Sequence, residues 1–171
     1  GSWLLIIFAG NDTTRNTMSG GIKLLHENQS QKDLLMNNLD LLPNFINETV
    51  RCVSPVIHMR RTSLEEAEIN GQKIGPYEKI SLWYGAANRD PDIFENPDEF
   101  NILRENADKH LAFGIGRHTC LGKPVALMQL KEFYSQFLTR FKDFEMNGDW
   151  KVAPNNFVHA IQEMPIKFTP E

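Results

Sequence analysis

One cysteine of this chain lies in a glycine-rich segment at the start of an apolar helical pattern. Cys120 follows Gly114 and Gly116 and precedes Gly122, and apolar side chains recur at helical spacing after it. The free N–H groups and positive dipole of a helix N-terminus favour an anionic sulfur, which binds metals or attacks electrophiles. Glycines also let a flat ligand approach closely. The segment therefore predicts a cofactor face; the alternative is an inert buried cysteine.

A polar stretch near the start of the chain is the second candidate for chemistry. The stretch Ala9-Gly10-Asn11-Asp12-Thr13-Thr14 follows the run Trp3 to Phe8, which is apolar all round, as a helix or strand that other segments cover would be. Its residues cost roughly 3 kcal/mol in helix propensity relative to alanine. Because helical spacing resumes beyond it, the stretch predicts either a break or a functional kink. A plainer alternative makes Asp12 the N-cap of a helix.

A third feature is a pair of opposite charges at helical spacing. Glu48 and Arg51 stand three residues apart in a helical pattern that begins at Pro43, so they share one face. On the surface such a pair would stabilise a helix by only about 0.2–0.5 kcal/mol. Taken alone, the spacing is a weak signal.

Composition narrows the class of protein. The chain has 171 residues and a net charge of −4, without the basic stripe that nucleic acid requires, so nucleic-acid binding is not expected. Two cysteines without a C-x-x-C motif favour a reducing, cytoplasmic location. Gly1-Ser2 has the composition of an expression scar, and the run Trp3 to Phe8 is too short for a membrane anchor.

Together these features resemble the cytochrome P-450 family, the haem-thiolate monooxygenases, in its bacterial soluble type. Phe113, Gly116, Cys120 and Gly122 form the pattern F-x-x-G-x-x-x-C-x-G, which resembles the family's haem-binding loop. The stretch 9–14 is similar to the A-G-x-D-T-T groove in the long helix on the distal side of the haem. The pair Glu48 and Arg51 resembles the family's buried E-x-x-R pair.

The resemblance implies roles for individual residues. Cys120 would be the proximal iron ligand, and Asp12 and Thr13 would be the catalytic acid and alcohol that deliver protons to dioxygen. Arg61 and His118 would reach haem propionates, and Ala126 would pack on the porphyrin beside the loop residues Phe113, Gly114, Gly116 and Gly122. The residues implied to line the substrate pocket are Ala9, Gly10, Val56, Ile57, Phe157 and Val158.

Three positions depart from the family pattern. Glu99 stands where many members have an arginine, and we expect Arg104 to complete the Glu48–Arg51 network instead. Leu127 and Gln129 replace the commoner arginine and glutamate of the helix after the loop. These changes call into question the salt bridges of that helix, but they do not affect the expected haem site.

The expected fold is mainly α with small antiparallel β-sheets (α+β). We predict one unit, residues 1–171, as the C-terminal portion of a haem-binding monooxygenase domain that starts within the long distal helix. Local signals predict helices over 30–38, with Ser30 as the cap, and over 43–53. They also predict strands over 56–59 and 80–84, with turns at Asn70-Gly71 and Gly75-Pro76.

The resemblance implies an enzyme that inserts one atom of O₂ into a lipophilic small molecule. Haem b would be the cofactor, and NAD(P)H electrons would arrive through a ferredoxin or flavodoxin. One alternative is a haem-binding sensor or electron carrier, which would need Cys120 but no Asp12–Thr13 pair. Another is a non-catalytic structural fragment that lacks an N-terminal half.

Overall fold

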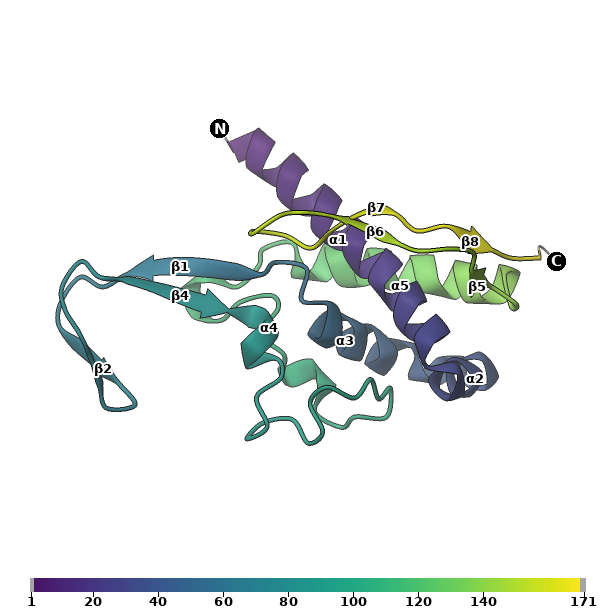
Figure 1. The fold of residues 1–171 in the computed structure, drawn as a ribbon, viewed down its shortest axis with the longest axis horizontal. Coiled ribbons are helices and arrows are strands. Elements are labelled where there is room, and N and C mark those ends of the chain that lie inside the picture. The colour runs from purple at the N-terminus through teal and green to yellow at the C-terminus, as the bar shows by residue number, and fades with distance from the viewer. Residues whose placement is uncertain (1, 170–171) are drawn as a thin grey trace.

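Helices form the centre of the chain and short antiparallel strand pairs lie beside them in the computed structural model, which describes residues 2–169 (Figure 1). The helices are α1 (Ser2–Glu27), α2 (Gln29–Asn37), α3 (Leu42–Val53), α4 (Tyr84–Ala87) and α5 (Lys123–Arg140), with 3-10 turns η1 (Leu39–Leu41), η2 (Ala107–Lys109) and η3 (Gly116–His118). The strands are β1 (His58–Thr62), β2 (Ala67–Ile69), β3 (Gln72–Ile74), β4 (Lys79–Trp83), β5 (Glu145–Met146), β6 (Lys151–Ala153), β7 (Ala160–Glu163) and β8 (Ile166–Lys167). Strand β1 pairs with β4, β2 with β3, β5 with β8 and β6 with β7.

The predicted fold class, mainly α with small antiparallel β-sheets, is confirmed. Gly1 of the predicted expression scar lies outside the described residues.

Helix α1 continues through the polar stretch 9–14 without a break. The Thr13 hydroxyl donates to the Ala9 carbonyl at 2.7 Å, and the Thr17 hydroxyl donates to the Thr13 carbonyl at 2.8 Å. These bonds satisfy the hydroxyls within the helix. Because Asp12 lies in the helix interior, the alternative that it caps a helix N-terminus is wrong. Packing of α1 against α3 and α5 overrides the poor propensity of the stretch.

The boundaries of α2 and α3 differ slightly from the expected ones. Helix α2 starts at Gln29 with Asn28 as its N-cap residue, so the predicted cap at Ser30 is wrong. The Asn28 amide instead donates back to the Leu24 carbonyl at 2.8 Å. Helix α3 has Pro43 in its first turn, as expected, and ends at Val53; the next residue, Ser54, caps it with a left-handed φ of 42°.

The predicted strands differ from the observed strands in where they begin and end. The strand predicted over 56–59 begins only at His58, and Val56 instead forms an isolated bridge with Val158. The strand predicted over 80–84 ends at Trp83, because Tyr84 starts α4. The turn at 70–71 closes the β2–β3 hairpin as predicted, with φ values of 48° and 78° that suit the Asn-Gly pair.

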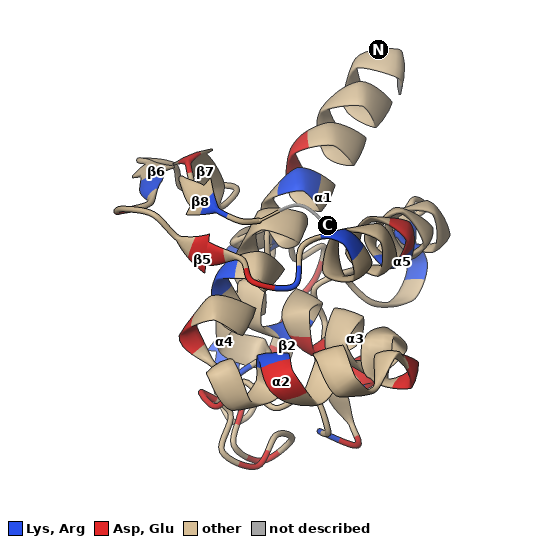
Figure 2. Ribbon diagram, turned by 90° about the vertical axis from the view of Figure 1, so that its right-hand side faces the viewer, with Lys and Arg blue, Asp and Glu red and all other residues tan. Residues whose placement is uncertain are grey.

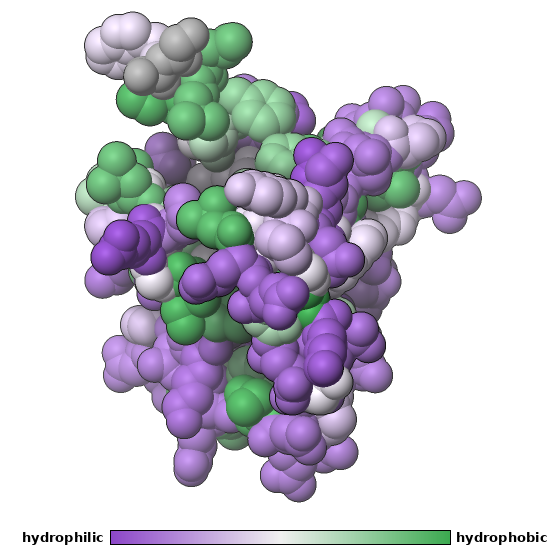
Figure 3. All heavy atoms as spheres, turned by 90° about the vertical axis from the view of Figure 1, so that its left-hand side faces the viewer, coloured by the Kyte–Doolittle hydropathy of each residue, from purple (hydrophilic) through white to green (hydrophobic). Residues whose placement is uncertain are grey.

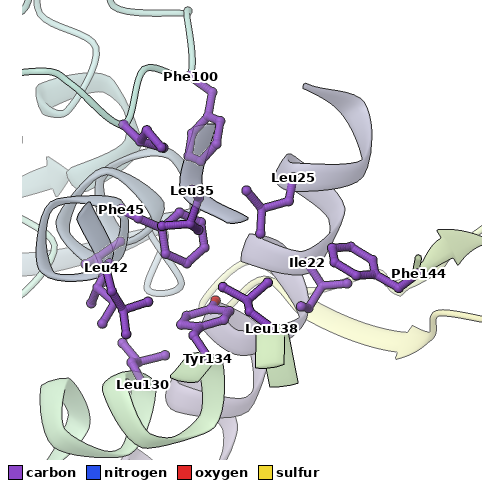
Figure 4. Packing of buried hydrophobic residues seen from close by; sticks show 13 residues of the cluster. Ile22, Leu25, Leu35, Leu42, Phe45, Phe100, Leu130, Tyr134, Leu138 and Phe144 are labelled. Carbon is purple, nitrogen blue, oxygen red and sulfur yellow. The ribbon is translucent and has the colours of Figure 1, made fainter. Parts of the chain in front are cut away.

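The core lies where α1, α3 and α5 meet. Ile22 and Leu25 of α1, Phe45 of α3, and Tyr134 and Leu138 of α5 are buried together there (Figure 4). The rings of Phe45 and Tyr134 meet edge to face with their centroids 4.7 Å apart. Because burying a large apolar side chain stabilises the fold by about 1.5–3 kcal/mol, this cluster fixes the position of α5 and of the loop before it.

The first turns of α1 project beyond the helices that α1 packs against (Figure 2). Trp3 is 80% exposed and Leu4 is 72% exposed, so this chain by itself leaves the start of the run Trp3 to Phe8 uncovered. Figure 3 shows hydrophobic side chains gathered at the end of the molecule where α1 begins. Within residues 2–169, no helix is long and apolar enough to cross a membrane.

Candidate functional site

The cysteine loop is closed by backbone hydrogen bonds. The Cys120 N–H donates to the Phe113 carbonyl at 2.8 Å, and the Gly114 N–H donates to the Leu111 carbonyl at 2.8 Å. Gly114 and Gly116 have φ values of 70° and 68°, which are strained for any residue with a Cβ atom. At Gly114 a Cβ atom would also lie 3.2 Å from the His118 carbonyl oxygen. The turn therefore requires glycine at both positions.

Cys120 itself is exposed, so the alternative of an inert buried cysteine is wrong. It stands three residues before α5, whose first residue, Lys123, donates its N–H to the Cys120 carbonyl at 3.3 Å. Large apolar side chains of the same loop and the next helical turns are also exposed, namely Ile115, Leu121, Val125 and Met128. A sulfur among exposed apolar side chains fits a flat apolar group such as haem that takes an axial thiolate ligand.

The predicted acid and alcohol lie next to each other on α1 and are differently bound. The Asp12 carboxylate is partly exposed and pairs with Arg15, one turn later, at 3.1 Å. The Thr13 hydroxyl donates to the Ala9 carbonyl. Asp12 therefore reaches solvent, whereas Thr13 faces its own helix backbone.

Helices α1 and α5 are joined directly beyond these residues. The Tyr134 hydroxyl on α5 donates to the Thr17 carbonyl at 2.8 Å and lies 3.1 Å from the Met18 carbonyl. Burial raises the pKa of Tyr134 well above its ordinary value, so the phenol keeps its proton and remains a donor. This contact fixes the position of the Thr13 turn of α1 relative to α5, the helix that follows Cys120.

One buried carboxylate is shared by two arginines. Arg51 donates to the two Glu48 oxygens at 2.7 and 2.8 Å, and Arg104 Nε lies 3.1 and 3.2 Å from the same oxygens. Burial lowers the pKa of Arg51, but the hydrogen bond to Glu48 and the nearby charges of Cys52, Glu48 and Asp98 together raise the pKa overall. Both arginines also donate to the Glu99 backbone carbonyl at 3.0 Å. Glu99 thus joins the network through its backbone.

Four of the expected substrate-pocket residues lie side by side. The Ile57 N–H donates to the Phe157 carbonyl at 2.9 Å, and Val56 bridges to Val158. The Phe157 ring stacks on that of Phe8 with centroids 6.4 Å apart, which brings this pair of segments against α1 just before Ala9 and Gly10. The expected set is thus brought together from three distant parts of the chain.

The remaining expected residues occupy separate places. Arg61 lies on β1, half-buried, and donates to the Arg60 carbonyl at 3.0 Å. His118 ends η3 and is exposed. Ala126 lies in the first turn of α5, where its N–H donates to the Gly122 carbonyl at 2.9 Å. Leu127 packs on the core, while Gln129 is exposed.

A cleft of about 560 Å³ separates α1 from α5 on one face, and the residues that line it include Gly10, Arg15, Met128 and Glu132. Neither Cys120 nor Thr13 is among the residues that line it, so we do not place the chemistry there. Within residues 2–169, no group of three or more His, Cys, Asp or Glu side chains could hold a metal ion. A single sulfur ligand to a prosthetic group remains compatible with this arrangement.

The family model described as Cytochrome P450 matches residues 23–169. The chain belongs to the cytochrome P450 family. This confirms the resemblance read from the cysteine loop. The match extends from the last turns of α1 to the end of the described residues, and so includes the Glu48 network and the loop of Cys120.

Curated P450 relatives cover the whole chain, but the chain covers less than half of each. It is 37% identical over 171 residues to a linalool 8-monooxygenase of Pseudomonas putida, spanning 100% of the chain and 42% of that protein. It is 40% identical over 169 residues to a steroid C26-monooxygenase of Mycolicibacterium smegmatis, spanning 98% and 42%. At the family level these relatives are monooxygenases.

Solved P450 structures share the fold closely. Cytochrome P450-153 from Novosphingobium aromaticivorans superposes with a TM-score of 0.94 at 39% identity, over 99% of this chain and 43% of that one. The arrangement of helices and small sheets is therefore that of the corresponding part of a P450.

Sequence reasoning missed several residues that shape this site. Arg15 pairs with Asp12, and the i, i+3 spacing was a visible signal for it. Gly21 lies under Tyr134, and the pair Gly20-Gly21 inside a helical pattern was a signal for close packing. Asn88 accepts a hydrogen bond from the Leu111 N–H, just before the cysteine loop, and no local sequence pattern predicts this contact.

Proposed function

We propose that the intact protein is a haem-thiolate monooxygenase that inserts one oxygen atom of O₂ into a lipophilic small molecule. The observation that carries this is the exposed Cys120 on a glycine loop closed by its hydrogen bond to Phe113. Because the chain spans 42% of its relatives' length, the activity is proposed for the whole protein. Haem, when bound, supplies the chemistry that activates dioxygen.

In this proposal the loop residues hold the cofactor. The Cys120 sulfur would bind the haem iron, and the hydrogen bond from the Cys120 N–H to the Phe113 carbonyl holds the backbone of this exposed cysteine. Ala126 and Gly122 are small, so they would leave room for the haem ring to pack against them. Arg61 and His118 are proposed to bind the propionates, and their guanidinium and imidazole groups are suited to carboxylates.

The proton path is proposed to run through α1. Asp12 is partly exposed, so its carboxylate can take protons from water, and its bond to Arg15 keeps it oriented at the helix surface. The Thr13 hydroxyl must rotate away from the Ala9 carbonyl to pass a proton onward, since it now donates to that oxygen at 2.7 Å. A relay of this kind needs no strong base.

The names of two relatives support the proposed class of substrate. One is named linalool 8-monooxygenase and the other steroid C26-monooxygenase, and both linalool and steroids are lipophilic molecules. The paired segments of Val56, Ile57, Phe157 and Val158 offer an apolar wall beside Ala9 and Gly10. We propose a lipophilic substrate here and a ferredoxin- or flavodoxin-type partner that carries NAD(P)H electrons.

The test is the absorption spectrum of the ferrous-CO form of the intact protein, followed by Cys120→Ala. We expect a strongly red-shifted Soret band in the wild type, because a thiolate ligand produces it, and its loss in the variant. A parallel Cys52→Ala variant should keep the band, because burial raises the pKa of Cys52 to about 11 and holds it as a thiol. An unchanged band in Cys120→Ala would refute the proposal.

A further inference from the structure

Asn88, which follows α4, is fully buried and all of its polar groups are bonded. Its carbonyl accepts from Arg51 Nη1 at 2.7 Å, and its N–H donates to the Tyr84 carbonyl at 2.8 Å. Its side-chain Nδ2 donates to Ser54 Oγ at 2.8 Å, and its Oδ1 accepts from the Leu111 N–H at 2.6 Å. A side chain satisfied this completely is held in one orientation.

The bond pattern fixes which end of the amide is which. Ser54 Oγ donates to the Arg51 carbonyl at 2.9 Å, so its lone pair is left to accept from Asn88 Nδ2. The Leu111 N–H can only donate, so the amide oxygen Oδ1 faces it. Arg51, Ser54 and Asn88 therefore form a closed ring of hydrogen bonds at the end of α3, and Asn88 Oδ1 links this ring to the segment before the cysteine loop.

That link leads to the cysteine in two short steps. The Leu111 carbonyl accepts from the Gly114 N–H, and the Phe113 carbonyl accepts from the Cys120 N–H, each at 2.8 Å. The Tyr84 hydroxyl, from the helix that Asn88 ends, lies 3.6 Å from where a Cβ on Gly114 would stand. Because Arg51 is also bonded to Glu48, these hydrogen bonds connect the buried Glu48–Arg51 pair to the cysteine loop through Asn88.

We propose that Asn88 is a positioning residue for the Cys120 thiolate. Its amide transmits the fixed geometry of the Glu48–Arg51 pair to Leu111 and so holds the base of the loop from which the sulfur is presented. The inference rests on the proposed haem-thiolate function. It adds a residue whose side chain touches neither the haem nor the substrate.

The experiment compares Asn88→Leu, which keeps the size but loses both bonds, with Asn88→Asp, which keeps an acceptor for Leu111. Asn106→Leu is the matched control, because the Asn106 amide bonds to the Ile93 carbonyl and not to the loop. In intact haem-loaded protein, two quantities are measured: hydrogen exchange at the Leu111 amide, and the fraction of the ferrous-CO form with the thiolate-type Soret band.

In Asn88→Leu we expect Leu111 exchange to rise about 5- to 30-fold, as the loss of one buried hydrogen bond predicts, and the thiolate fraction to fall. Asn88→Asp should restore most of both, and Asn106→Leu should change neither. If Asn88→Leu is not recovered as folded protein, Asn88→Ala replaces it, since it also lacks the acceptor.

Two results would overturn the inference. One is a wild-type thiolate fraction in Asn88→Leu despite faster exchange at Leu111. The other is an equal loss in the Leu and Asp variants, which would mean that the acceptor is not what matters. A wild-type protein without the thiolate band would refute the proposed function instead, and the exchange measurement would still report on the bond from Asn88 to Leu111.

Discussion

A Cβ atom placed on Gly21 of α1 would lie 2.1 Å from the hydroxyl oxygen of Tyr134 on α5. The same hydroxyl donates to the Thr17 carbonyl, so the two helices touch backbone to side chain at this point. Thr49 of α3 closes the third side, since its Cγ2 would be 2.9 Å from the same Cβ. Gly21 is thus the position that lets α1, α3 and α5 meet.

Gly21→Ala should destabilise the protein by about 1–3 kcal/mol, because overpacking forces the Tyr134 ring or the helices to shift. Gly10→Ala is the control within the same helix, since a Cβ atom there meets nothing within 4 Å. It should stabilise the helix by about 0.5–1 kcal/mol. Urea unfolding of both variants checks this. Equal effects at the two glycines would contradict the close-packing argument.

Arg104→Met should cost about 3–5 kcal/mol of unfolding free energy, because it leaves the buried Glu48 carboxylate with one of its two arginines removed. The exposed pair Lys151–Glu163, at 2.7 Å, gives the contrast. Lys151→Met should change stability by no more than about 1 kcal/mol. Denaturant unfolding of the two variants decides the point, and a small loss in Arg104→Met would show that the network is not what stabilises this region.

His110 should make stability depend on pH below neutrality. Burial, and after it the charge of the Lys123 ammonium, lower the pKa of His110 from 6.5 to about 4. Smaller effects come from Asp108 and Glu48, which raise this pKa, and from Arg51, which lowers it. The unfolded chain therefore binds a proton that the folded chain does not between those values. The stability is present above pH 6.5 and is lost as the pH falls towards 4.

Replacing His110 by Asn should remove this dependence, which is on the order of 2–3 kcal/mol over the window. The free energy of unfolding is measured from pH 7.5 down to pH 4 in both proteins. Above about pH 6.5, where unfolded histidine is itself neutral, the two curves should run parallel. Parallel curves below that value as well would mean that His110 is not held neutral.

Thr13→Ala in the intact enzyme should leave substrate binding nearly unchanged and lower the product formed per NAD(P)H consumed at least several-fold. In the proposed relay the Thr13 hydroxyl passes protons during turnover, and in the structure it donates to the Ala9 carbonyl of its own helix and not to the loop of Cys120. Thr13→Ser keeps a hydroxyl and should keep most of the coupling. Product and peroxide are measured together; equal coupling in all three proteins would remove Thr13 from the relay.

The sequence by itself determined the local features of this protein. The glycines around Cys120 predicted a loop with backbone freedom and few side chains, and the structure has φ values of 70° and 68° at Gly114 and Gly116. Likewise, Asn70-Gly71 predicted a hairpin and Pro43 the first turn of a helix, since steric limits on φ act on neighbouring atoms. The i, i+3 spacing of Glu48 and Arg51 placed them on one face.

Only the tertiary structure decided which distant groups meet. It brought Arg104 to the Glu48 carboxylate, Asn88 to Leu111, and Val56 to Val158. It also carried α1 unbroken through a stretch of poor propensity and left Trp3 exposed. These outcomes depend on which surfaces are buried against one another, and a buried polar group takes whichever partner the packing of remote segments provides, because leaving it unpaired costs more than any local preference.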